Sequence, residues 1–220
     1  MEKINKSTID FLAALSRNNY KEWFDKHRDE YVKAKSNFTE FVQSLINEIS
    51  SFDPIIKGLE AKNCIFRINR DIRFSNDKSP YKTNMGAFLV KGGKQNGDKY
   101  AGYYFHIEPG KSMLAGGAYM PPAQWLTAIR ENINDDPERF LSIINDSTFR
   151  NYFGQIEGEK LKKAPKGFDP TCKYIELLKH KSFLALKETS DNEVISEKYL
   201  SMSVDVFRAM KPLNDFLNEY

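Results

Sequence analysis

In the first quarter of the chain, hydrophobic residues recur at intervals of three and four, the spacing of an amphipathic helix. A first helix is marked by the apolar residues Ile9, Phe11, Leu12 and Leu15. Ser7 precedes this stripe and is a suitable N-cap. Asn19 is placed to cap a second stripe that runs from Phe24 to Ile49. The second stripe is one long helix, or two helices if it breaks at Ser36-Asn37, because Ser and Asn side chains compete for backbone hydrogen bonds.

The middle of the chain changes to a period of two, which is the signature of strands. Residues 85–90 predict one strand. Residues 102–108 and 112–119 flank Pro109-Gly110, a pair that suits the centre of a type II turn. These two segments therefore predict an antiparallel hairpin.

Helical spacing returns in the last part of the chain. Trp125, Ile129 and Ile133 indicate one helix, and Asp136 caps another that begins at Pro137. The remaining elements are an irregular segment at 153–169, a short helix through Tyr174, Leu177 and Leu178, a strand at 183–187, and a final helix through 200–217 that Pro212 should kink.

This order of elements predicts an α+β fold with a mainly antiparallel sheet in the middle of the chain, covered by N-terminal and C-terminal helices. The connections between strands are too short for repeated parallel crossovers. No internal repeat and no Pro/Gly/Ser linker divides the sequence. We therefore expect residues 1–220 to form a single domain.

The stretch from Cys64 to Asn84, CIFRINRDIRFSNDKSPYKTN, concentrates cationic residues beside apolar ones. As a strand, it places Phe66, Ile68, Ile72 and Phe74 on one face and Arg67, Asn69, Asp71 and Arg73 on the other. Arg70 breaks the alternation and falls on the apolar face. Beyond residue 74, Ser75-Asn76-Asp77 predicts a turn, and Pro80 keeps Ser79 out of the helical region.

This cationic stretch has two interpretations. In the first, it binds phosphate or carboxylate through guanidinium forks and ammonium groups, with an aromatic stacking face beside them. The ligand-binding residues are then Arg67, Arg70, Arg73, Lys78, Tyr81 and Lys82. In the second, the arginines pair internally with Asp71, Asp77 and helix carboxylates such as Glu22, and the network stabilises the fold. Five cations against two local acids leave an excess of three, which favours a ligand.

Acid–base chemistry has three candidates: His106, Glu108 and Asp71. His106 and Glu108 share a strand face with Tyr104, and they suit proton transfer if that face borders the cationic stretch. The alternative is a solvated face of an antiparallel sheet. We expect His27 at the core boundary and His180 at the surface. The histidines and cysteines lack metal-ligand spacing, so the sequence gives no reason to invoke a metal or a cofactor.

Composition sets limits on partners and location. The chain has 33 basic and 30 acidic residues, a net charge of +3 that is too near balance to imply nucleic acid or a membrane by bulk charge. The N-terminus has no apolar run long enough for export or for crossing a membrane. Cys64 and Cys172 fit reduced thiols, so we expect a cytoplasmic protein. The sequence leaves the oligomeric state open.

The chain resembles the bacterial family named domain of unknown function 2461. The most specific segment is RINRDIRFSNDKSPYKTN. The other matching segments are NNYKEWFDKHRDEY, GYYFHIEPGKSMLAGGAYMPP, APKGF and IELLKHKSF, so the resemblance spans nearly the whole sequence. It implies a single-domain soluble cytoplasmic protein, and it brings no established activity.

The residues themselves favour a protein that binds a small anionic or phosphorylated ligand, either as a binding domain or as an enzyme that acts on it. One alternative is contact with RNA or DNA through the same cations, with Tyr81 and Tyr104 as stacking platforms. Another is a structural or interaction role without a ligand. Salt dependence separates the first two, because contacts to many phosphates weaken steeply as salt rises.

Overall fold

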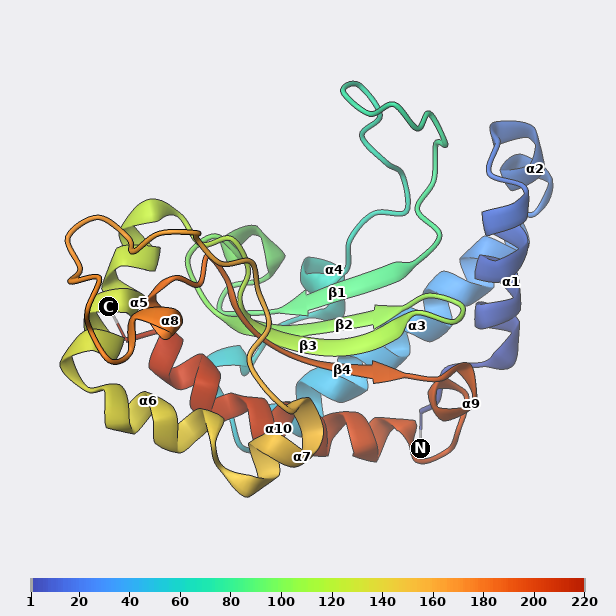
Figure 1. The fold of residues 1–220 in the computed structure, drawn as a ribbon. Coiled ribbons are helices and arrows are strands. Elements are labelled where there is room, and N and C mark those ends of the chain that lie inside the picture. The colour runs from blue at the N-terminus through green and yellow to red at the C-terminus, as the bar shows by residue number, and fades with distance from the viewer. Residues whose placement is uncertain (1, 220) are drawn as a thin grey trace.

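The computed structural model describes residues 2–219 (Figure 1). The helices are α1 (Lys6–Arg17), α2 (Lys21–Lys26), α3 (Arg28–Ile49), α4 (Ala61–Cys64), α5 (Ala123–Asp135), α6 (Pro137–Ile144), α7 (Ser147–Phe153), α8 (Ile175–Leu178), α9 (Asp191–Val194) and α10 (Tyr199–Leu217), with 3-10 turns η1 (Pro54–Ile56) and η2 (Lys94–Asn96). The strands are β1 (Met85–Leu89), β2 (Gly102–Ile107), β3 (Ser112–Ala118) and β4 (Phe183–Thr189).

The four strands form one sheet in the order β1-β2-β3-β4, and every neighbouring pair is antiparallel. In the β2–β3 hairpin, Gly102 lies opposite Gly117 and His106 opposite Met113. Helices precede and follow this sheet and pack on it. The structure thus confirms the predicted α+β class and the predicted hairpin.

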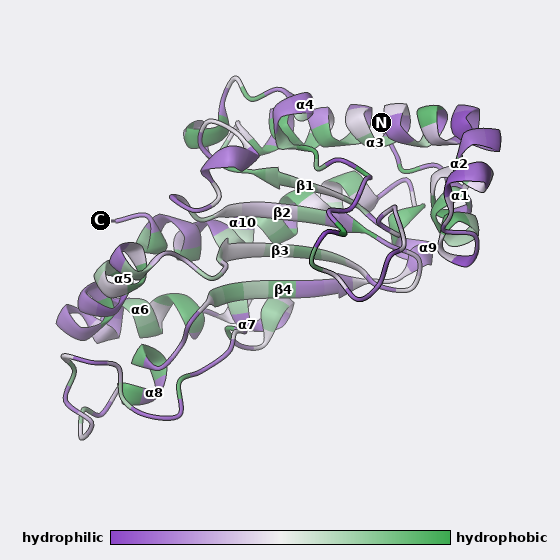
Figure 2. Cartoon of the chain, turned by 90° about the horizontal axis from the view of Figure 1, so that it is seen from above, coloured by the Kyte–Doolittle hydropathy of each residue, from purple (hydrophilic) through white to green (hydrophobic). Residues whose placement is uncertain are grey.

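One face of the sheet is covered by α3 and α10 (Figure 1). The ring of Phe105 stacks on Phe38 and Phe41 of α3, with centroids 5.5 and 5.1 Å away, and Tyr103 packs on Phe207 of α10 at 5.3 Å. Because side chains alternate along a strand, the intervening residues of β2 point to the opposite face. We call this the open face, and Figure 2 looks onto it, with α10 behind the strands.

Two glycines of β3 let the sheet pack closely. A methyl group at Gly116 would lie 2.8 Å from the sulfur of Met210 in α10. Gly117 has a φ of +113°, and a methyl there would lie 2.0 Å from the carbonyl oxygen of Phe183 in β4. Larger residues would therefore push α10 or β4 away from β3.

The long N-terminal stripe breaks at His27, between α2 and α3, and the predicted break at Ser36-Asn37 is wrong. The side chain of Asn37 is buried and bonds a different segment instead of its own helix. Its Oδ1 accepts from the Asn5 amide at 2.8 Å and from the Thr8 hydroxyl at 2.9 Å. Because these partners satisfy the amide, it does not compete with the backbone of α3.

The predicted helix caps had mixed outcomes. Asp136 caps α6 by accepting from the Arg139 amide at 3.1 Å, as expected. Ser7 lies inside α1, one residue beyond its start. Asn19 precedes the cap position of α2 and bonds elsewhere. Pro212 lies within α10, which continues to Leu217.

We expect Gly117→Ala to lower the melting temperature far more than Gly110→Ala. Both glycines have positive φ, at +113° and +72°, so both substitutions carry backbone strain of about 1–3 kcal/mol. Only position 117 adds a clash, because nothing lies within 4 Å of a methyl at Gly110. Thermal melts of the two variants measure the difference, and equal shifts would show that β3 and β4 are not held in close contact.

Candidate functional site

Residues 65–84 form an arm that rises beside the open face (Figure 1). Its two limbs pair only near the base, where the Arg70 amide donates to Pro80 at 2.9 Å and the Lys82 amide to Ile68 at 2.8 Å. The prediction of a strand through residue 74 is wrong, since the limbs make isolated bridges without a continuous ladder. Phe74 accordingly does not share a buried face with Ile68, and its side chain is 95% exposed.

The base of the arm is fastened to the N-terminal helices by Asn19. The Asn19 side chain donates to the Tyr81 carbonyl at 2.9 Å and accepts from the Tyr81 amide at 3.1 Å. The Tyr81 ring is buried and stacks on Phe24 of α2, with centroids 4.0 Å apart. One face of this predicted stacking platform is therefore already occupied.

Arg70 stabilises the arm from within. Its guanidinium pairs with Asp77 and donates to the Ser79 carbonyl at 3.0 Å. Hydrogen bonds from Ser79, together with Arg70, lower the pKa of Asp77 to about 2. The Asp77 side chain is 61% exposed, so the carboxylate that pairs with Arg70 is not buried.

The cations at the tip of the arm also have partners. Arg73 donates to both carboxylate oxygens of Asp71, at 2.9 and 2.7 Å, and these bonds lower the pKa of Asp71. Lys78 donates to the Ile72 carbonyl at 3.1 Å. For Arg70 and Arg73 the structure thus has the internal pairing that the sequence offered as the alternative to a ligand.

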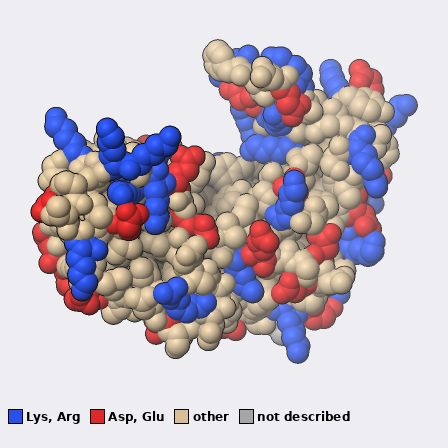
Figure 3. All heavy atoms as spheres, viewed as in Figure 1, with Lys and Arg blue, Asp and Glu red and all other residues tan. Residues whose placement is uncertain are grey.

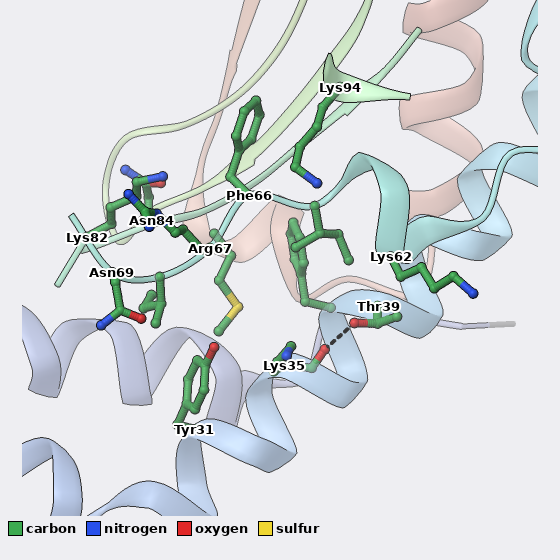
Figure 4. Close-up of a pocket in the computed structure, with 14 residues that line it drawn as sticks. Tyr31, Lys35, Thr39, Lys62, Phe66, Arg67, Asn69, Lys82, Asn84 and Lys94 are labelled. Atoms are coloured by element: carbon green, nitrogen blue, oxygen red, sulfur yellow. Dashed lines mark hydrogen bonds between the residues drawn. The ribbon is translucent and has the colours of Figure 1, made fainter. Parts of the chain in front are cut away.

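Arg67 and Lys82 lie instead at a cavity of about 710 Å³, which we call the basic pocket (Figure 4). The pocket is bounded by the base of the arm, α3, α4 and η2. Its cationic lining residues are Lys35, Lys62, Arg67, Lys82 and Lys94. Neutral polar groups come from Tyr31, Thr39, Asn69 and Asn84, and no carboxylate lines it. In Figure 4, Arg67, Lys82 and Asn84 lie close together, and the Tyr31 hydroxyl points into the cavity from α3.

Among the described residues, the two arm cations of the basic pocket are in no ion pair, although the charge of Arg67 acts on Asp71 at longer range. Within residues 2–219, the Arg67 side chain makes no hydrogen bond or ion pair. The Lys82 ammonium lies 5.4 Å from the centre of the Phe66 ring. Burial, and secondarily the charge of Arg67, lower the pKa of Lys82. By contrast, Lys62 pairs with Glu60 outside the pocket.

Three of the pocket cations were not predicted from the sequence. Lys35, Lys62 and Lys94 come from α3, α4 and η2, where a single exposed lysine gives no signal. A smaller cavity of about 250 Å³ shares Lys82 and Asn84 with the basic pocket, and its lining also includes Arg70, Tyr81 and Thr83. The predicted ligand residues therefore divide between two cavities, while Arg73 and Lys78 line neither.

His106 lies on the open face within a hydrogen-bonded row. Its Nδ1 is 3.0 Å from the Tyr104 hydroxyl, and its Nε2 is 3.3 Å from Glu108. Glu108 also accepts from the Thr83 hydroxyl at 2.6 Å. Phe66 connects this row with the basic pocket, because its ring packs edge-on to Tyr104 with centroids 6.3 Å apart. The open face and the cationic stretch thus border each other at Phe66.

The other histidines lie away from this region. His27 stacks on Trp23 at the junction of α2 and α3, with centroids 4.0 Å apart. The prediction that His180 lies at the surface is wrong: it is buried, and burial lowers its pKa to about 4. The prediction rested on the flanking residues Lys179 and Lys181. In the structure, His180 forms an isolated antiparallel β-bridge with Lys160.

Lys and Arg side chains also gather across the molecule from the arm, over the segment between α7 and α8, with a hollow between the two (Figure 3). That segment carries Lys160, Lys162, Lys163 and Lys166. Within residues 2–219, no group of three or more His, Cys, Asp or Glu side chains is arranged to hold a metal ion. None of the described helices is long and apolar enough to cross a membrane.

The fold and the site define an α+β protein whose antiparallel sheet has one helix-covered face and a basic pocket at its β1 edge. A family model described as "Conserved hypothetical protein (DUF2461)" matches residues 7–216. The chain belongs to this family. Searches of curated proteins and of solved structures found no match.

We expect Arg70→Ala to be the most destabilising of the three alanine substitutions at Arg67, Arg70 and Arg73. The Arg70 side chain is 25% exposed and bonded inside the arm, whereas that of Arg73 is 76% exposed. Arg67→Ala removes repulsion with Lys82 and should leave stability unchanged or slightly higher. Urea midpoints rank the variants, and equal small losses at all three positions would contradict the ranking.

Proposed function

We propose that the protein binds a small anionic ligand, carrying phosphate or carboxylate, in the basic pocket. The observation that carries this proposal is the composition of the pocket: five cationic residues line it and no acidic residue does. The like charges of Arg67 and Lys82 repel one another, and the charge of Arg67 lowers the pKa of Lys82. An anion between Arg67 and Lys82 relieves that repulsion.

The chemistry of the pocket suits a phosphorylated organic compound. A guanidinium recognises two oxygens of a phosphate at once, and an ammonium adds a mobile point charge. Each such charge-assisted contact contributes about 1.5–3 kcal/mol. The apolar lining residues Phe38, Ile65, Phe66, Ile68 and Met85 provide a surface for the organic part.

A small ligand is favoured over nucleic acid. A polymer needs many unpaired cations along its path, yet Arg70, Arg73 and Lys78 already bond groups within the arm. The ring of Tyr81 is covered by Phe24.

We also infer a cytoplasmic location, because Cys64 and Cys172 are both free thiols.

Phosphate and a nucleoside monophosphate at millimolar concentration should each raise the melting temperature. A ligand that binds only the folded state stabilises it by about 2.7 kcal/mol at 100 times its Kd, or very roughly 5–10 °C for a chain of this size. Arg67→Ala and Lys82→Ala should lose the shift. Arg73→Ala is the matched control, since it removes the same charge from the same arm outside the pocket.

Two results would count against the proposal. One is a panel of phosphorylated and carboxylated compounds that leaves the melt unchanged. The other is an equal loss of the shift in Arg73→Ala, which would indicate a general charge effect. Binding of single-stranded oligonucleotides with a steep salt dependence would instead favour the nucleic-acid alternative.

A further inference from the structure

Tyr104 and His106 of β2 and Glu108, one residue beyond the strand, form a continuous hydrogen-bonded row on the open face. Tyr104 and His106 are two residues apart, so the strand directs both to the same side, and the hydrogen bond from His106 brings Glu108 into the row. The contacts run from the Tyr104 hydroxyl to His106 at 3.0 Å and from His106 to Glu108 at 3.3 Å. His106 is only 5% exposed, which is far from the solvated face that alternation alone suggests.

The row fixes where its protons are. An ionised Glu108 only accepts hydrogen bonds, so Nε2 of His106 carries the proton that points to it. The other ring nitrogen, Nδ1, is then an acceptor, and the Tyr104 hydroxyl donates to it. Burial lowers the pKa of His106, against the opposing effect of Glu108, so the imidazole is neutral at pH 7.

The neighbouring strands add no charge beside the imidazole. Its cross-strand partners are Gly86 in β1 and Met113 in β3, and neither titrates. Thr83, which bonds the far oxygen of Glu108, does not titrate either. Glu108 is therefore the charged group that acts on His106.

We propose that Tyr104 is a catalytic nucleophile activated by His106, with Glu108 as a positioning residue. A hydroxyl, an imidazole base and a carboxylate that orients the base are the parts of an activated-nucleophile triad. In the step, the Tyr104 oxygen forms a bond to the electrophilic atom of the substrate, and the leaving group departs with its electron pair. The Tyr104 proton passes to Nδ1, which gives an imidazolium paired with Glu108.

The substrate class follows from the neighbouring pocket, and in this respect alone the inference rests on the proposed function. Phe66 lies between Tyr104 and the Lys82 ammonium, in contact with both. A phosphate ester anchored by Arg67 and Lys82 would cross Phe66 to reach the Tyr104 hydroxyl. The reaction class is group transfer to tyrosine from such an activated ester.

Gly86 provides room for the nucleophile. A methyl group there would lie 2.9 Å from the Tyr104 hydroxyl oxygen, and that hydroxyl sits at the end of a rigid ring. The φ of Gly86 lies outside the left-handed region, so Gly86→Ala carries no backbone strain of that kind. The three atoms nearest to this methyl all belong to Tyr104, so the substitution acts first on the hydroxyl.

The test uses phenylmethylsulfonyl fluoride, an uncharged reagent that forms an oxygen–sulfur bond with tyrosine and releases fluoride. Mass spectrometry then gives the labelling rate at each site. Tyr20 and Tyr119 serve as internal references, because they are 50% and 74% exposed. At pH 7 we expect Tyr104 to react at least tenfold faster than either, although it is more buried than both.

The pH profile distinguishes activation from mere exposure. The Tyr104 rate should be level from pH 7 to 9, since His106 is already neutral there. The reference rates should rise with pH toward the ordinary tyrosine pKa of about 10. Glu108→Gln should slow Tyr104 and move its profile to lower pH, because the carboxylate raises the pKa of His106.

His106→Gln and Gly86→Ala should each bring the Tyr104 rate down to that of the references or below. Three outcomes would overturn the proposal: no labelling of Tyr104 while Tyr20 and Tyr119 react, equal labelling in wild type and His106→Gln, or a Tyr104 profile that follows the references. Because the reagent is neutral, this result does not depend on the basic pocket. If phosphate did not change the melting temperature, the proposal of a phosphate ester as the substrate would fail, but the labelling result at Tyr104 would still stand.

Discussion

The packing of Tyr103 and Phe105 against α10 and α3 determines which way every other side chain of β2 points. A slip of one residue in this strand would exchange the two faces and put His106 into the core. The aromatic contacts below the sheet therefore hold the polar row above it. The register with β1 follows from the same packing, and it places Gly86 opposite His106, beside the Tyr104 hydroxyl. The chemistry of the open face is thus a consequence of the hydrophobic core.

The arm is stabilised differently from the sheet, because it has little hydrophobic core of its own. Polar contacts hold it, from Asn19 at its base to Asp77 and Asp71 further out. These carboxylates form ion pairs with two of the arginines, whereas Arg67 is in no ion pair within residues 2–219. Ion pairing along the arm thus gives arginines different roles: Arg70 and Arg73 stabilise the arm, whereas Arg67 is available to a ligand. Position along the arm, more than residue type, decides the role.

The sequence predicted those parts of the fold that depend on periodicity. The β2–β3 hairpin alternates around Pro109-Gly110, and both the pairing and the antiparallel sheet are confirmed. The arm was predicted as a strand because its alternation is real, but a strand also needs a neighbour along its length. The pocket lysines of α3, α4 and η2 were beyond prediction, since their meeting point depends on tertiary contacts. His180 failed for a similar reason, as its neighbours in sequence are not its neighbours in space.

The polar contacts of Arg70, Arg73 and Lys78 are local, so the tip of the arm is mechanically separate from its base. Arg70, Arg73 and Lys78 bond groups within residues 70–79, so the tip is a self-contained module. Insertions or deletions around Phe74 would lengthen or shorten the arm without moving its base. The base of the arm carries Arg67 and Lys82 and is bonded to Asn19. A change in the length of the tip would therefore leave the geometry at the β1 edge unchanged.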